Sequence, residues 1–121
     1  MNKAQALNEF WNSFGIDAYD EHTVIPDVQL PYITYNVVTD SLNNVINLHG
    51  SLWYKSMSWK DITLKTEEIA AYIGYGGQVI KLDDGYLWIT KGVPFAQRMN
   101  DTNDTIRRMY LNIQVEYLTS I

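Results

Sequence analysis

The feature that most constrains the fold is a strict alternation of apolar and polar side chains near the C-terminus. It lies within the segment from Thr105 to Thr119, where every second residue from Met109 to Tyr117 is apolar. The apolar members are Met109, Leu111, Ile113, Val115 and Tyr117. Successive side chains of a strand point to opposite faces, so this segment is predicted to be a strand with one apolar and one polar face. Such a strand is typical of an antiparallel sheet that helices cover on one face.

Two amphipathic segments are predicted to supply those helices. In the first, four large side chains recur at helical spacing: Leu7, Phe10, Trp11 and Phe14. This spacing places them on one stripe and predicts a helix from Asn2 to Phe14. Gly15 follows where a left-handed C-terminal residue is expected. We expect the stripe to face the core, since amphipathic helices usually bury such a face.

The second helix follows a strand in the segment from Ser51 to Ile73 (SLWYKSMSWKDITLKTEEIAAYI). Ser58 suits the N-cap position, and Asp61 three residues later approximates a capping box. Gly74 is expected to end the helix. Its apolar stripe consists of Ile62, Thr66, Ile69, Ala70 and Ile73.

The rest of the chain is assigned to strands and connecting segments. Further strands are predicted over Pro31 to Asp40, Val45 to Met57, Gln78 to Leu82 and Gly85 to Lys91. The last two form a hairpin around Asp83-Asp84-Gly85. Ile16 to Gln29 and Gly92 to Asp104 are predicted to be loops. The order is therefore α-β-β-α-β-β-β, an α+β fold in which an antiparallel or mixed sheet is packed on one face by two helices. We expect residues 1–121 to form a single domain.

Composition narrows the classes of function. The net charge of −5 argues against binding a nucleic-acid backbone over a broad face, although it is compatible with lining a passage for DNA. The absence of cysteine excludes a disulfide scaffold, Cys-ligated zinc and thiol catalysis. The N-terminus shows no secretory signal, and no apolar run is long enough to span a bilayer, so we expect synthesis in the cytosol.

No catalytic, cofactor or metal site is predicted. The acidic segment from Asp17 to Glu21 lacks the alternating ligands, central glycine and terminal glutamate of a calcium loop. Gly74 to Gly77 follows a helix and opens a strand, whereas phosphate loops do the reverse. His49 and Ser51 share one strand face, but no orienting acid is evident in the sequence. Their spacing therefore favours a half-exposed polar strand over a hydrolase.

Several of these segments together resemble the tail-completion and tail-terminator proteins of long-tailed bacteriophages. The resemblance rests on LPYITY (Leu30 to Tyr35), a turn cluster, a strand ending in LWYKS, and then SWKDITLKTEEIAAYI. The matching positions are Pro31, Tyr32, Ile33, Tyr35, Trp53, Ser56, Ser58, Ile62, Ile69 and Ile73. It covers most of the chain, and it is a likeness of pattern with no diagnostic motif.

This resemblance implies a virion structural protein without enzymatic activity or cofactor. Such proteins form a ring, usually hexameric, at the head-proximal end of the tail tube. They contact the major tail-tube protein on one side and the neck or head-closure protein on the other, and DNA passes through the lumen. Two alternatives stay open: a head–tail adaptor or head-closure protein, and, from another class, a small cytosolic ligand-binding domain.

Four residues are the candidates for contacts between subunits or partners. Trp53 is predicted to lie on the more polar face of its strand, where it is either half-covered by its own chain or an interface anchor. In the loop from Gly92 to Asp104, Phe95 and Met99 either tuck under the loop or contact a neighbouring subunit. Arg98 lies between them.

Overall fold

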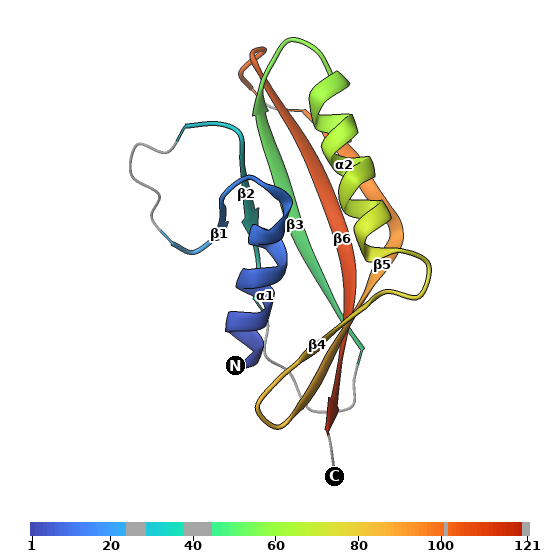
Figure 1. Ribbon diagram of the computed structural model, residues 1–121. Coiled ribbons are helices and arrows are strands. Elements are labelled where there is room, and N and C mark those ends of the chain that lie inside the picture. The colour runs from blue at the N-terminus through green and yellow to red at the C-terminus, as the bar shows by residue number, and fades with distance from the viewer. Residues whose placement is uncertain (24–28, 38–44, 101, 120–121) are drawn as a thin grey trace.

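The computed structural model describes residues 1–23, 29–37, 45–100 and 102–119. The elements are α1 (Lys3–Trp11), η1 (Asn12–Phe14), β1 (Ala18–Asp20), β2 (Tyr32–Tyr35), β3 (Val45–Lys55), α2 (Lys60–Ile73), β4 (Gln78–Lys81), β5 (Gly85–Met99) and β6 (Ile106–Thr119). The α+β class is confirmed, and the observed order is α-β-β-β-α-β-β-β (Figure 1). The added strand is β1, which lies in the segment that we expected to be irregular.

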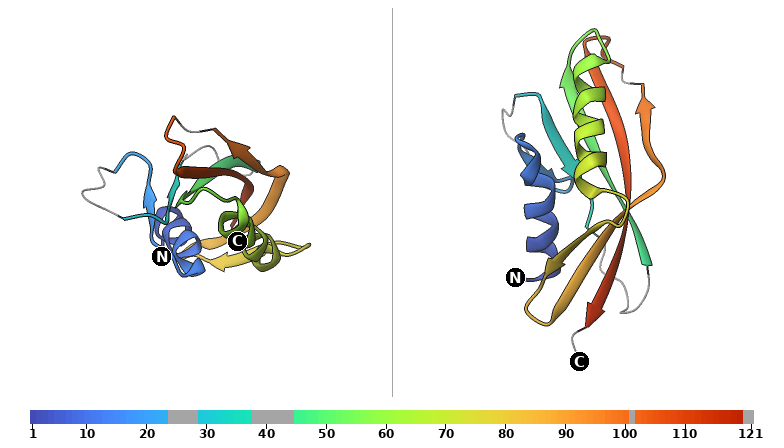
Figure 2. Two further views of the ribbon diagram at one scale, coloured as in Figure 1. Left: turned by 90° about the horizontal axis from the view of Figure 1, so that it is seen from above. Right: turned by 45° about the vertical axis from the view of Figure 1, so that its right-hand side comes forward.

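One mixed sheet of six strands runs in the order β1-β2-β3-β6-β5-β4. β1 and β2 are parallel, and every other neighbouring pair is antiparallel. β3 and β6 form its centre, paired from Val45 opposite Glu116 to Lys55 opposite Ile106. The strands are strongly twisted, and both helices lie on the same side of the sheet (Figure 2). The alternation along β6 therefore predicted correctly a sheet with one covered face.

The core lies between the helices and this covered face. Leu7, Phe10, Trp11 and Phe14 are all buried, as the helical stripe predicted. Ile62, Ile69 and Ile73 of α2 are at most 1% exposed. The sheet contributes Ile33, Leu48, Leu52, Leu87, Ile89, Leu111, Ile113 and Val115. The ring of Trp11 stacks on that of Tyr35, with centroids 6.2 Å apart.

The helix ends differ from the predictions by one to three residues, and the last turn of the first predicted helix is the 3-10 helix η1. In α1, Asn2 is the N-cap and forms a reciprocal capping box with Gln5, and Gly15 adopts the expected positive φ of 82°. In α2 the N-cap is Trp59, which makes no side-chain capping bond, so the assignment of Ser58 to that position was wrong. Ser58 lies one residue earlier, and its hydroxyl accepts a hydrogen bond from the Lys60 N–H (3.1 Å).

β5 is the largest departure from the expected structure. The segment from Gly92 to Met99 was predicted to be a loop, but it belongs to a strand that pairs with β6 as far as Met99 opposite Arg108. Between Lys91 and Ala96 the register shifts, so that four residues of β5 stand opposite Asn112 alone. Gly92 approaches Asn112 so closely that a Cβ atom would lie 2.8 Å from the Asn112 Cβ. The Gly-Val-Pro-Phe sequence therefore encodes a bulge within a strand.

On the β1 side of the sheet, β2 is shorter than predicted and β1 was not predicted. β2 covers Tyr32–Tyr35, and the rest of the predicted strand up to Val37 is not extended sheet. Two segments lie outside the described residues. They are residues 38–44, which include the predicted turn cluster, and residues 24–28 of the predicted loop from Ile16 to Gln29. β1 has three residues and is held by long-range bonds, such as that from the Ile33 N–H to the Asp17 carbonyl oxygen (2.9 Å). Three residues are too few to show a periodicity in the sequence.

Candidate interaction surface

The face of the sheet turned away from the helices carries a row of aromatic and cationic side chains across four strands. Trp53 on β3 stacks on Tyr32 of β2, with ring centroids 6.2 Å apart and planes at 25°. Tyr32 meets Tyr19 of β1 edge to face at 6.3 Å. The Arg108 guanidinium of β6 lies 4.5 Å from the centroid of a Trp53 ring. We call Tyr19, Tyr32, Trp53 and Arg108 the aromatic row.

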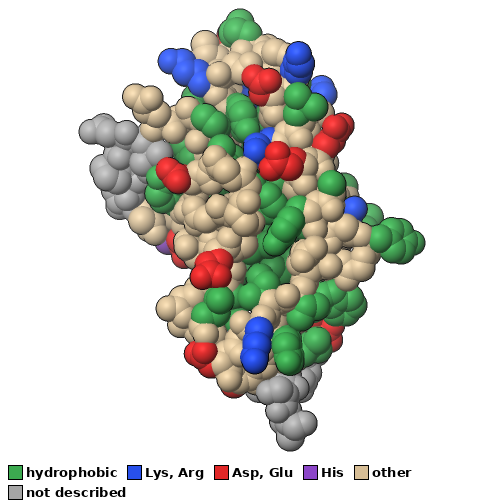
Figure 3. Space-filling model, in the orientation of Figure 1, with side chains coloured by type: hydrophobic (Ala, Val, Ile, Leu, Met, Phe, Trp, Pro, Cys, Tyr) green, Lys and Arg blue, Asp and Glu red, His purple; other side chains and the backbone are tan. Residues whose placement is uncertain are grey.

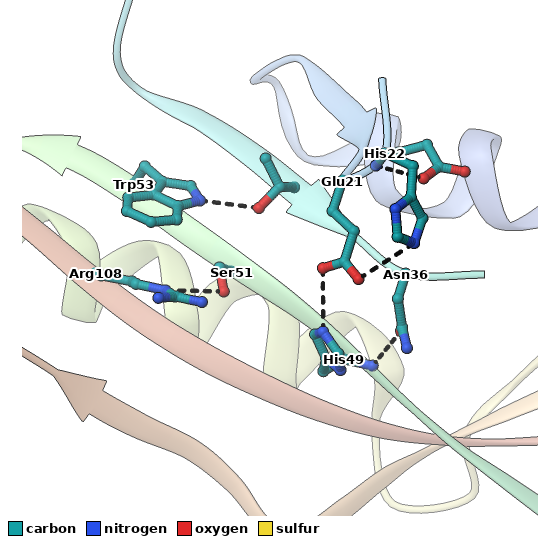
Figure 4. Close-up of polar contacts among 9 residues, drawn as sticks. Glu21, His22, Asn36, His49, Ser51, Trp53 and Arg108 are labelled. Carbon is teal, nitrogen blue, oxygen red and sulfur yellow. Dashed lines mark hydrogen bonds and ion pairs between the residues drawn. The ribbon is translucent and has the colours of Figure 1, made fainter. Parts of the chain in front are cut away.

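Trp53 is fixed within this row by its own chain. Its indole Nε1–H donates to Thr34 Oγ1 at 2.9 Å (Figure 4). Its side chain is half-buried, so one part of the ring stays accessible. The prediction that Trp53 lies on the polar face of β3 is confirmed, because it pairs with Arg108 while its neighbour Leu52 is buried in the core. Whether Trp53 also anchors a partner stays a prediction.

The His49 and Ser51 pair does not form a nucleophilic site. The Arg108 Nε–H donates to Ser51 Oγ at 3.2 Å, and Ser51 is buried. His49 Nε2 lies 3.2 Å from Glu21 Oε2, and its ring stacks on Tyr110 at 4.9 Å. An acid thus does face His49, which the sequence did not show. Figure 4 nevertheless shows Ser51 and His49 engaged with different partners, an arrangement that fits a polar network linking β3 to its neighbours.

The other three candidate residues divide between core and surface. Phe95 is half-buried and packs against the core, which supports the first of its two predicted roles. Arg98 and Met99 are exposed at the end of β5. Earlier in β5, within the bulge, Val93 is 95% exposed. The structure therefore brings Arg98 and Met99 to the surface near the start of α2, apart from Phe95.

A cluster that the sequence did not reveal surrounds Trp59. The guanidinium of Arg98 lies 4.9 Å from a Trp59 ring centroid, and that of Arg107 lies 5.4 Å away. Arg107 is held by backbone carbonyl oxygens of Asp104 and Met57, each at 2.8 Å. A surface hollow of about 360 Å³ adjoins the ring. We call it the Trp59 hollow; its lining residues are Ser58, Trp59, Lys60, Thr63, Leu64 and Arg98.

Tyr54, at the end of β3 near α2, has a raised pKa. Burial is the first cause, and the negative charges of Asp61 and Glu68 add to it, so the pKa of Tyr54 is raised above its ordinary value of 10.0. The phenol therefore stays neutral where β3 meets α2. This is a structural contact, since Tyr54 packs against the core.

The described residues show no group of three or more His, Cys, Asp or Glu side chains that could hold a metal ion. Nor does that part of the chain contain a helix long and apolar enough to cross a membrane. The aromatic row and the Trp59 hollow each place an arginine guanidinium against a tryptophan ring.

Comparison with known proteins shows a likeness in structure. No protein-family model matches the chain, and no curated protein matches its sequence. Its structure is similar to that of a chain in the virion of a native gene transfer agent particle, with a TM-score of 0.56 and 13% sequence identity. The match covers 91% of this chain and 84% of that one. At this identity, the match shows that the two chains share a fold.

Proposed function

We propose that this protein is a structural component of a phage-like virion. The observation that carries the proposal is the shared fold with a chain of the gene transfer agent virion, which extends over nearly the whole of both chains. The resemblance of LPYITY and the following strand-to-helix segment to phage tail-terminator proteins points to the same class of particle from independent information, the sequence.

Within that class, the role we favour is that of a tail terminator. The protein would form a ring, hexameric by analogy with that family, at the head-proximal end of the tail tube. One side of the ring would contact the major tail-tube protein and the other the neck or head-closure protein. DNA would pass through the lumen without sequence-specific contacts, which suits a chain of net charge −5.

The surfaces of the molecule support a function by assembly. The aromatic row presents a half-buried tryptophan beside an arginine, and both residue types are enriched at the centres of protein interfaces. The functional groups that would suggest hydrolysis are tied into separate contacts, with Ser51 bonded to Arg108 and His49 to Glu21. These contacts, together with the fold, support a non-enzymatic role.

A head–tail adaptor or head-closure protein is the alternative within the same particle, and a small ligand-binding domain is a more distant one. Immunogold labelling of intact particles tests the proposed position. We expect the label at the joint between head and tail. Label on the capsid surface or the distal tail tip would refute the proposed position in the particle. Separated heads and tails then distinguish the two roles, because a terminator stays with the tails and an adaptor or closure protein stays with the heads.

A further inference from the structure

Positive charge gathers at one end of an otherwise acidic molecule. The chain has 9 Lys and Arg residues against 14 Asp and Glu residues. Five of the 9 cations lie where β3 and β5 end and β6 and α2 begin. They are Lys55, Lys60, Arg98, Arg107 and Arg108. Figure 3 shows Lys and Arg side chains at this end, the upper one in the view.

The Trp59 hollow lies at this end, and some of its side chains make no ion pair or hydrogen bond among the described residues. Arg98 contacts the face of Trp59 and forms no ion pair with a carboxylate among the described residues. Thr63 Oγ1 is a buried atom without a hydrogen-bond partner in the described structure. Leu64 at the rim is 55% exposed, and nearby Met57 is 70% exposed. Cations, an indole ring and apolar rim atoms are therefore available together.

This combination suits a carboxylate carried on a peptide segment. A guanidinium recognises a carboxylate through two parallel N–H bonds, and a lysine ammonium adds a second charge-assisted contact. Because Arg107 is fixed by backbone carbonyl oxygens and packs on one ring with Arg98, the site is ordered before a ligand arrives. The apolar rim would cover the backbone of the incoming segment.

We infer that the Trp59 hollow receives the acidic β4–β5 turn of a second copy of this chain, an inference that rests on the proposed ring. The turn contains Asp83 and Asp84, and both side chains are exposed. Asp83 contacts the amino group of Met1 yet remains 78% exposed. A narrow hairpin turn can enter a hollow, whereas Glu67 and Glu68 stand on the broad face of a helix.

The placement of the two surfaces favours contact between copies. The β4–β5 turn lies at the opposite end of the molecule from the start of α2 (Figure 1), so the turn cannot fill the hollow of its own chain. A contact between two different surfaces is heterologous, and it repeats from copy to copy until the rotation closes a ring. Charge complementarity between the acidic turn and the cationic hollow sets which surfaces meet.

Charge reversal on each side tests the inference. One variant reverses the hollow (Lys60→Glu with Arg98→Glu), and the other reverses the turn (Asp83→Lys with Asp84→Lys). Matched controls make the same change of net charge elsewhere: Lys81→Glu with Lys91→Glu, and Glu9→Lys with Glu67→Lys. Circular dichroism and urea midpoints establish that each variant is folded. Native mass spectrometry and sedimentation velocity then measure assembly.

We expect each reversed variant to associate about tenfold or more weakly than the wild type, whereas the controls associate normally. An equimolar mixture of the two reversed variants should assemble again, because the acidic hollow of one copy then meets the basic turn of the other. Folded reversed variants that assemble like the wild type, or a mixture that stays unassembled, would overturn the inference and leave the proposed ring standing. A wild type that never assembles would count against the ring itself.

Discussion

At the scale of single residues, several positions combine a structural contact with a surface role. Trp53 is the plainest case, since its indole N–H is bonded to Thr34 while part of its ring stays accessible between Tyr32 and Arg108. The sequence placed Trp53 correctly on the polar face of β3. It could not show the Trp59 cluster, because Trp59, Arg98 and Arg107 come from three separated segments that only the folded sheet brings together.

Trp53→Ala should lower stability and also weaken assembly. Loss of the stack on Tyr32 and of the bond to Thr34 should reduce the free energy of unfolding by about 1–3 kcal/mol. Trp53→Phe keeps an aromatic ring and loses only the hydrogen bond, so it should cost about 1 kcal/mol. Urea unfolding measures stability, and native mass spectrometry measures assembly. If Trp53→Ala is folded and assembles like the wild type, Trp53 does not contribute to an interface.

Gly50→Ala should disturb the core. A Cβ at this position would lie 2.7 Å from the Trp11 ring, which is fully buried and stacked on Tyr35. We expect a loss of about 1–3 kcal/mol in unfolding free energy because the ring cannot withdraw without strain. Gly76→Ala is the matched control, since nothing lies within 4 Å of a Cβ there. Equal urea midpoints for the two variants would show that Trp11 is not packed as described.

At the scale of elements, the central strands, both helices and the β4–β5 hairpin were predictable, whereas β1 and the second half of β5 were not. In β6 and in α2, apolar side chains recur with the period of a strand and of a helix, because each element buries one of its faces. The second half of β5 carries Gly92 and Pro94, which are locally typical of loops, and it is a strand because β6 offers a pairing partner. β1 depends in the same way on β2. Pairing between distant segments leaves little trace in a single sequence.

The docking of α2 on the sheet should depend on its buried isoleucines. Ile69 is 0% exposed, so Ile69→Ala should lower the free energy of unfolding by about 2–5 kcal/mol through lost burial and the cavity left behind. Glu67→Ala, on the exposed side of the same helix, should change it by no more than about 0.5 kcal/mol. Chemical denaturation of both variants gives the comparison, and a small effect of Ile69→Ala would contradict the assigned helix face.

The contact between β3 and α2 should also make stability depend on alkaline pH through Tyr54. The pKa of Tyr54 is raised in the folded protein, so the unfolded chain loses its proton first as the pH rises. The stabilisation is therefore complete below the ordinary tyrosine pKa of about 10 and is lost as the pH rises through the folded-state value. Above the ordinary tyrosine pKa, the free energy of unfolding should fall more steeply with increasing pH for the wild type than for Tyr54→Phe. The same pH dependence of the unfolding free energy in both proteins would contradict the raised pKa of Tyr54.

At the scale of the whole molecule, the fold leaves one face of the sheet and one charged end available for partners. The helices occupy the other face, so the aromatic row and the Trp59 hollow lie on separate parts of the surface. The inferred contact joins the Trp59 hollow to the β4–β5 turn, and a subunit with two dissimilar contact surfaces is suited to a closed ring built from head-to-tail contacts. The chain shares its fold with a chain of a gene transfer agent virion, and we propose that a ring of this kind belongs to a phage-like particle.

Native mass spectrometry of the purified wild-type protein, with negative-stain images of the same sample, tests the ring most directly. The proposed hexameric ring predicts one dominant species of about six copies that images as a ring. A strict monomer over the whole accessible concentration range, or a two-fold dimer that uses the same surface on both copies, would contradict the account.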